Sequence, residues 1–219
     1  MTDAGANAAV KQQLLEVAQE MSSSGLVEGT AGNVSARLPD GNVALTPSSL
    51  DYATMTLEDL VVCDLDGNVV EGHRSPTTEK ALHLSALALH PDVHSAMHCH
   101  AKYCTMFALA RKPIPPVIEE VVVYLGGEVG VAEYRTTGSV DLADEVAKHV
   151  GDRAAVLMAN HGLFVVGRDA AHALKLAHLV ERTAEIVYGA EQLGGIVPLP
   201  DEIVEQFSSY YRMGRGASS

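Results

Sequence analysis

The chain has 219 residues, of which 47% are hydrophobic and 20% are charged, and its formal net charge is −13 at pH 7. This composition predicts one globular domain with a sizeable core. The acidic balance argues against nucleic-acid binding, which needs a basic surface, although a helix end and a few hydroxyls can hold a phosphate locally.

The two longest apolar stretches, residues 154–159 and 163–167, are too short to span a bilayer. Residues 1–13 lack the basic and apolar pattern of a secretory signal. The three cysteines, Cys63, Cys99 and Cys104, form no CxxC pair. We therefore expect a cytoplasmic protein with reduced cysteines and no membrane partner.

The first half of the chain predicts a helix followed by hairpins. Apolar residues at helical spacing predict a helix over residues 7–24. Asp40-Gly41 and Asp66-Gly67 are typical of hairpin turns. Strands are predicted on either side of these turns, after residues 29–35 and over 43–46, 60–63 and 68–70. A helix is then predicted to start at Pro76-Thr77-Thr78-Glu79, with a threonine cap and Glu79 in the first turn, and to end near residue 89.

The second half alternates the two element types. Strands are predicted over residues 95–100, 117–124, 129–134, 154–158 and 163–166, and helices over 101–112, 140–150, 170–193 and 201–212. No repeat or interdomain linker is evident. The pattern predicts an α/β fold in which residues 1–219 form a single domain, with a central mixed, mostly antiparallel β-sheet flanked by helices.

His98-Cys99-His100 is the first sign of chemistry. Residues i and i+2 of a strand point to the same face, so both imidazoles can approach one cation, whereas Cys99 points away. Two histidines on one face of an otherwise apolar strand are costly to bury without a partner. The spacing alone favours metal ligation and ordinary strand residues about equally.

Further polar residues lie at predicted loops and helix starts. His161 stands in a tight loop between two apolar strands, where a turn histidine is the commoner role. Glu79 is either an acid that favours the helix dipole or a carboxylate that contacts a metal and exchanges a proton with substrate. Thr77 and Thr78 are either helix caps or part of an anion site.

Five motifs taken together resemble the class II aldolase/adducin family, and within it the L-fuculose-1-phosphate aldolase type. They occur in the order and at distances typical of that family and cover nearly the whole chain. The motifs are GTAGNVS at 29–35, LTPS at 45–48, PTTE at 76–79, HCH at 98–100 and NHGL at 160–163.

The resemblance implies a role for each matching residue. His98, His100 and His161 match the metal ligands, and Glu79 matches a residue that binds the metal at rest and acts as acid and base. The positions that match the phosphate cradle are Asn33, Thr46, Thr77 and Thr78. Thr30 lies in the same loop as Asn33, and Ser48, which follows Thr46-Pro47, could donate its backbone N–H to the phosphate. The expected cofactor is one divalent cation per subunit, Zn²⁺ before Mn²⁺ or Co²⁺.

The resemblance also implies an assembly. The family is typically a homotetramer whose active sites lie between subunits. The C-terminal tail, about residues 201–219, would reach a neighbouring subunit, with Tyr210 as the matching catalytic tyrosine and Tyr211 as its rival.

The implied reaction is cleavage of a ketose 1-phosphate to dihydroxyacetone phosphate and an aldehyde by a zinc-dependent aldehyde-lyase. The ketose would resemble fuculose 1-phosphate or a 5-deoxypentulose 1-phosphate. Two positions depart from the family pattern: Ser48 replaces a usual glycine, and the segment after Ile114-Pro115 carries no tyrosine before Tyr124. A decarboxylase, 4-epimerase or dehydratase of the same superfamily is the main alternative, and a non-catalytic adducin-like module is a further one.

Overall fold

In a computed structural model of the protein, which describes residues 3–216, eight strands form one sheet in the order β4-β3-β2-β1-β5-β8-β7-β6. All neighbouring pairs are antiparallel except β6 and β7, which are parallel. The strands are β1 (Asn33–Arg37), β2 (Val43–Leu45), β3 (Val61–Cys63), β4 (Val69–Glu71), β5 (Ser95–Cys99), β6 (Val131–Ala132), β7 (Ala155–Met158) and β8 (Gly162–Gly167).

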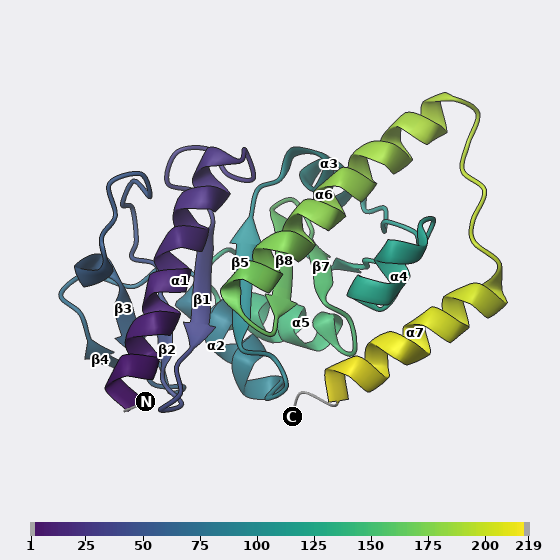
Figure 1. The fold of residues 1–219 in the computed structure, drawn as a ribbon. Coiled ribbons are helices and arrows are strands. Elements are labelled where there is room, and N and C mark those ends of the chain that lie inside the picture. The colour runs from purple at the N-terminus through teal and green to yellow at the C-terminus, as the bar shows by residue number, and fades with distance from the viewer. Residues whose placement is uncertain (1–2, 217–219) are drawn as a thin grey trace.

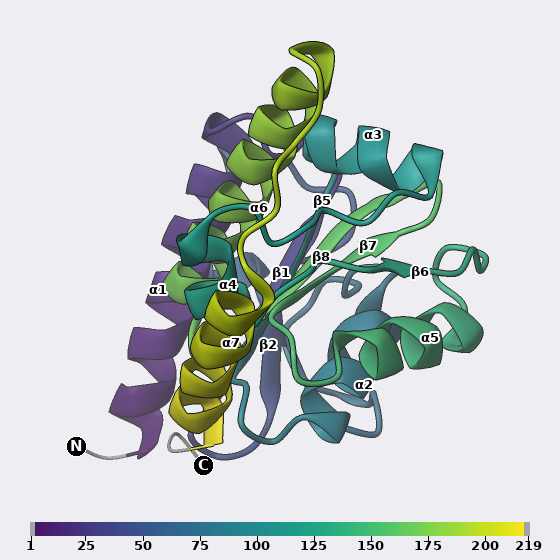
Figure 2. The same cartoon turned by 90° about the vertical axis from the view of Figure 1, so that its right-hand side faces the viewer.

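Helices cover both faces of this sheet (Figures 1 and 2). One face carries α1, α4, α6 and α7, and the other carries α2 and α5 (Figure 2). The helices are α1 (Asp3–Ser23), α2 (Lys80–Leu89), α3 (Lys102–Ala110), α4 (Glu119–Leu125), α5 (Val140–Val150), α6 (Ala170–Gln192) and α7 (Asp201–Gly216), with a 3-10 turn η1 (Leu57–Asp59). Within residues 3–216, none of the helices is long and apolar enough to cross a membrane.

The alternation of side chains along the strands divides the core into two parts. On β5, Met97 and Cys99 pack with the α1 and α6 face, whereas Ala96 packs with the α2 and α5 face. His98 therefore points to the α2 side, opposite to Cys99. Cys63, Cys99 and Cys104 are buried and unbonded, as the sequence predicts.

The predicted fold class is confirmed, and so are both hairpin turns, where Gly41 and Gly67 have φ angles of 90° and 89°. The strand predicted over 117–124 is wrong, because Glu119–Leu125 is helix α4. Its valines favour a strand, but two glutamates begin the helix and Gly126 ends it in the left-handed conformation. Tertiary packing decides the outcome, since Val121, Val122 and Leu125 are buried.

Two smaller predictions also need correction. The strand predicted over 129–134 is reduced to Val131–Ala132. The helix predicted to start with a threonine cap instead has Glu79 at its N-cap, and no side chain caps it. The Glu79 carboxylate is thereby free to turn away from the helix end.

Candidate functional site

The three predicted metal ligands converge at one end of the central strands. His98 lies on β5, His100 directly follows it, and His161 lies in the turn between β7 and β8. One ring nitrogen from each lies within 4.8 Å of the others. Nε2 of His98 is 3.0 Å from Nε2 of His100, and the rings of His98 and His161 have centroids 4.5 Å apart.

The backbone orients the His98 ring. Its Nδ1 lies 3.0 Å from the carbonyl oxygen of Leu163, which can only accept a hydrogen bond. Nδ1 therefore carries the proton, and Nε2 presents a lone pair toward His100. Burial lowers the pKa of His98 well below its usual value, and it lowers the pKa values of His100 and His161 as well. The cluster is thus held in the neutral form that a cation requires.

Glu79 faces this cluster from the start of α2. Its Oε2 lies 3.5 Å from Nε2 of His98, and its Oε1 lies 3.5 Å from Nε2 of His161. Asn33 on β1 donates a hydrogen bond from Nδ2 to Oε2 at 2.9 Å. Glu79 is only 6% exposed, so a carboxylate is buried among three histidines.

The arrangement fits a bound metal ion. Glu79 Oε1 and His161 Nδ1 are buried and have no hydrogen-bond partner, which is costly for polar atoms. Nε2 of His98 and Nε2 of His100 also lie 3.0 Å apart, close enough for both to bind one cation. Three imidazoles and one carboxylate are a common ligand set for zinc.

Gly162 leaves room for the imidazoles. A Cβ at this position would lie 2.4 Å from the carbonyl oxygen of Cys99, 3.2 Å from Cδ2 of His100 and 3.3 Å from Cε1 of His98. No larger residue fits here without moving the chain or the rings. The preceding turn residue, Asn160, has a φ angle of 56°, which places His161 next to the other two histidines.

The predicted phosphate-binding residues lie on two adjacent segments. Pro47 and Pro76 form an isolated antiparallel bridge, and the N–H of Thr77 donates to the carbonyl of Thr46 at 3.1 Å. The pairing places Thr46 and Ser48 beside the start of α2, where Thr77 accepts a hydrogen bond from the N–H of Glu79 at 3.2 Å. Asn33 joins this region through its bond to Glu79.

These residues differ in accessibility. Thr30 and Thr78 are exposed and Ser48 is half-buried, with its hydroxyl 3.3 Å from that of Ser49. Thr46 is fully buried, and its hydroxyl accepts a hydrogen bond from the N–H of Val34. Thr46 therefore links the end of β2 to β1, and its carbonyl also holds Thr77 in place.

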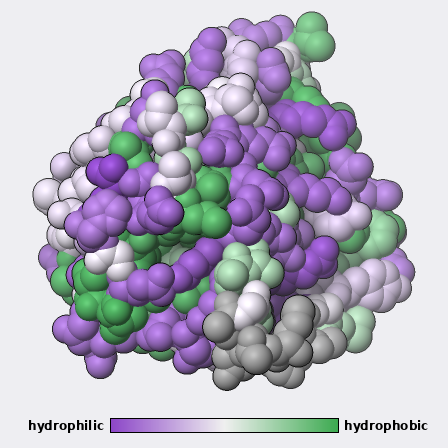
Figure 3. Space-filling model, turned by 60° about the vertical axis from the view of Figure 1, so that its left-hand side comes forward, coloured by the Kyte–Doolittle hydropathy of each residue, from purple (hydrophilic) through white to green (hydrophobic). Residues whose placement is uncertain are grey.

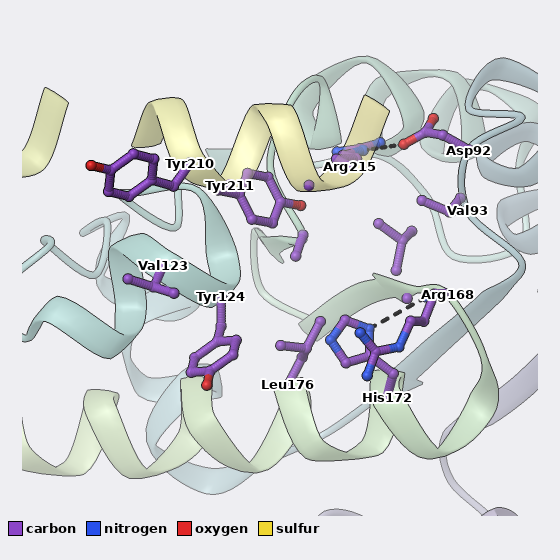
Figure 4. Close-up of a pocket in the computed structure, with 14 residues that line it drawn as sticks. Asp92, Val93, Val123, Tyr124, Arg168, His172, Leu176, Tyr210, Tyr211 and Arg215 are labelled. Atoms are coloured by element: carbon purple, nitrogen blue, oxygen red, sulfur yellow. Dashed lines mark hydrogen bonds and ion pairs between the residues drawn. The ribbon is translucent and has the colours of Figure 1, made fainter. Parts of the chain in front are cut away.

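Tyr210 is not part of this cluster within one chain. It lies on α7 beside a cavity of about 210 Å³ that is also lined by Val166 and Gly167, at the opposite end of β8 from Gly162 (Figure 4). Tyr210 is 50% exposed. Tyr211 packs over Gly126 and interacts with Arg215, which pairs with Asp92.

His83 was not predicted as a site residue. It lies one turn after Glu79 on α2, is fully buried, and contacts Asn33 and Ser35. The signal available in the sequence was its spacing of four residues from Glu79 in a mostly apolar segment, which places both on one side of α2.

The surface shows no single dominant apolar region on the face in Figure 3, where apolar patches alternate with polar residues. Exposed apolar side chains include Val69 and Val70 on edge strand β4.

Comparison with known proteins agrees with the fold. The family model described as Class II Aldolase and Adducin N-terminal domain matches residues 12–188. A 5-deoxy-D-ribulose 1-phosphate aldolase of Bacillus thuringiensis is 33% identical, over 92% of this chain and 94% of the relative. An L-fuculose phosphate aldolase of Escherichia coli is also 33% identical, over 91% of this chain and 94% of the relative.

A solved structure of an L-fuculose 1-phosphate aldolase superimposes with a TM-score of 0.88 at 35% identity, and the match covers 93% of this chain and 96% of that one. The family match includes the turn of His161, the strand of His98 and the N-cap Glu79. The chain belongs to the class II aldolase and adducin family.

Proposed function

We propose that this protein is a metal-dependent aldolase that cleaves a ketose 1-phosphate into dihydroxyacetone phosphate and an aldehyde. The observation that carries the proposal is the buried Glu79 carboxylate, which faces His98 and His161 at 3.5 Å. A non-catalytic module has no need for a buried carboxylate beside three convergent imidazoles. The names of the relatives support a phosphorylated deoxyketose as substrate.

His98, His100 and His161 would hold the cation, which we propose is Zn²⁺ because of the imidazole ligands, with Mn²⁺ or Co²⁺ as alternatives. When bound, it supplies a Lewis acid for the carbonyl and hydroxyl oxygens of the substrate. The carbonyl of Leu163 orients the His98 ring, and burial lowers the pKa values of all three histidines, which favours their neutral form.

Glu79 would move the proton. In cleavage the bond between carbons 3 and 4 of the ketose would break with its electron pair left on carbon 3, and the hydroxyl at carbon 4 would pass its proton to the Glu79 carboxylate as the aldehyde forms. Glu79 then delivers a proton to carbon 3 to give dihydroxyacetone phosphate, and it removes this proton in the reverse direction. Its burial, at 6% exposure, would exclude water from this step.

The phosphate would be bound by Asn33, Ser48, Thr77 and Thr78. Thr30 would lie at the edge of this phosphate site, and Thr46 would hold the other residues in position. Hydroxyls and backbone N–H groups at the start of α2 favour an anion there despite the negative charge of the chain. Tyr210 would complete the site of a neighbouring subunit in a homotetramer, which its exposure on α7 supports.

A retro-aldol assay tests the function. The zinc-loaded protein is given fuculose 1-phosphate, 5-deoxyribulose 1-phosphate and the same sugars without phosphate, and dihydroxyacetone phosphate is detected by coupled reduction. We expect cleavage of at least one phosphorylated ketose and none of the free sugars. Release of CO₂ from a sugar-acid phosphate, with no cleavage of any ketose 1-phosphate, would instead support the decarboxylase.

A further inference from the structure

A hydrogen-bonded chain of buried side chains runs behind Glu79. Asn33 bonds Glu79 through Nδ2, and Oδ1 of Asn33 contacts Nε2 of His83. Nδ1 of His83 lies 2.8 Å from Oγ of Ser35. Asn33, Ser35 and His83 are all at most 4% exposed, so this chain is shielded from water.

The partners fix the direction of every bond in the chain. A carboxylate only accepts hydrogen bonds, so the Asn33 amide must point Nδ2 toward Glu79 and Oδ1 toward His83. Since Oδ1 also only accepts, Nε2 of His83 must carry the proton. Nδ1 of His83 is then an acceptor, and the Ser35 hydroxyl donates to it.

The His83 ring has no freedom to leave this position. It is wholly buried on the inner side of α2, and its edge packs against Phe164 with ring centroids 5.7 Å apart. Asn33 pairs directly with His98 in the register of β1 and β5. The chain therefore links α2 to the strand that carries the first metal ligand.

We propose that His83 is a positioning residue that acts through Asn33 to hold the Glu79 carboxylate between His98 and His161. Without the donor of His83, the Asn33 amide can turn over and present Oδ1 to Glu79, which sets two acceptors against each other. The inference rests on the proposed function, because it concerns the same carboxylate. Mutation of a residue that hydrogen-bonds to a metal ligand and orients it typically lowers metal affinity by about 10- to 100-fold.

The test compares His83→Leu, which removes the donor, with His83→Gln, which keeps an N–H at similar reach. Zinc affinity is measured by competition with a chromophoric chelator, and His73→Leu on an exposed loop is the control. We expect the zinc dissociation constant to rise about 10-fold or more in His83→Leu and to stay near the wild-type value in His83→Gln.

A double-mutant cycle separates positioning from general destabilisation. In the Asn33→Ala background, His83→Leu is expected to change the zinc dissociation constant by less than about two-fold, because the link it acts through is gone. Unchanged zinc affinity in folded His83→Leu overturns the proposal, and so does a loss that persists in the Asn33→Ala background.

Ser35→Ala decides the question if His83→Leu does not fold. Removing this hydroxyl frees His83 to protonate Nδ1, so zinc affinity should fall, and an unchanged affinity overturns the proposal. A wild-type protein that binds zinc but cleaves no ketose 1-phosphate contradicts the proposed function and leaves this coupling standing.

Discussion

Gly162 lies so close to His98 that a methyl group on its Cα would stand 3.3 Å from Cε1 of the imidazole. The same methyl group would be only 2.4 Å from the carbonyl oxygen of Cys99. Strand β8 therefore approaches the end of β5 so closely that the first residue of β8 helps to set the positions of the histidines proposed as metal ligands.

Gly162→Ala is expected to weaken zinc binding and to destabilise the fold by about 1–3 kcal/mol, the usual cost of overpacking a dense interior. Gly189→Ala is the matched control, because it lies on α6 with nothing within 4 Å of its added Cβ. That change should stabilise the protein by about 0.5–1 kcal/mol. Chelator competition and urea unfolding measure both effects, and equal behaviour of the two variants would contradict the steric argument.

His98→Ala should lose most of the bound metal. His98 is the most buried of the three ligands, and its lone pair is aimed by the carbonyl of Leu163. Metal analysis of the purified variant measures the loss, with His73→Ala as an exposed control. Full occupancy in His98→Ala would remove this residue from the ligand set.

Glu79→Gln should lower turnover by about 10²- to 10⁴-fold, the usual contribution of a general acid or base. The amide keeps the size of the side chain and one oxygen, so the three histidines should retain most of the metal. Steady-state cleavage and metal content are measured on the same sample. Turnover near the wild-type level would show that another group moves the proton.

The sequence predicted the parts of the site that depend on local pattern. The i, i+2 spacing of His98 and His100 was enough to predict that their rings lie together, although β5 ends at Cys99 and His100 follows it. The position of His161 after an apolar strand was enough to place it in a turn. Their meeting at one point depends on β5 pairing with β8, which is a long-range contact that spacing does not encode. The family motifs supplied that information.

Other features depended on packing alone. The valine-rich segment of α4 favours a strand, but its burial against α6 and α7 makes it a helix. Glu79 was expected in the first turn, yet its backbone is at the N-cap, and its carboxylate faces the histidines rather than the helix end. His83 escaped attention because one histidine in an apolar helix has no visible partner until β1 is placed beside α2.

The stability of the metal-free protein should depend on pH through His83. Burial lowers the pKa of His83 from 6.5 to about 3. Between these two pH values the unfolded chain binds a proton that the folded chain does not, so stability falls as the pH falls.

The predicted loss from this one group is on the order of 2 kcal/mol between pH 7 and pH 5. Urea unfolding in the presence of a chelator measures it for the wild type and for His83→Gln. Between pH 7 and pH 5, His83→Gln should lose about 2 kcal/mol less stability than the wild type. If the stability of the wild type and that of the variant depend on pH in the same way, His83 has the same pKa in the folded and the unfolded protein.

Tyr210 and Tyr211 are adjacent on α7 but should give opposite results. The Tyr211 ring covers Gly126, where an added Cβ would approach it to 2.7 Å, and its hydroxyl interacts with Arg215. Tyr210 is half exposed and bonds only Gln206 among the described side chains. We therefore expect Tyr210→Phe to lower turnover without changing the thermal midpoint, if Tyr210 serves a neighbouring site.

Tyr211→Ala should lower stability by about 1–3 kcal/mol, because its partly buried ring packs against the core, while the folded protein that remains keeps its turnover per site. Mixing Tyr210→Phe subunits with Glu79→Gln subunits tests the intersubunit arrangement directly. Hybrid tetramers would contain sites with wild-type residues from both chains, so activity should rise above that of either variant alone. No gain on mixing would place Tyr210 outside the catalytic site.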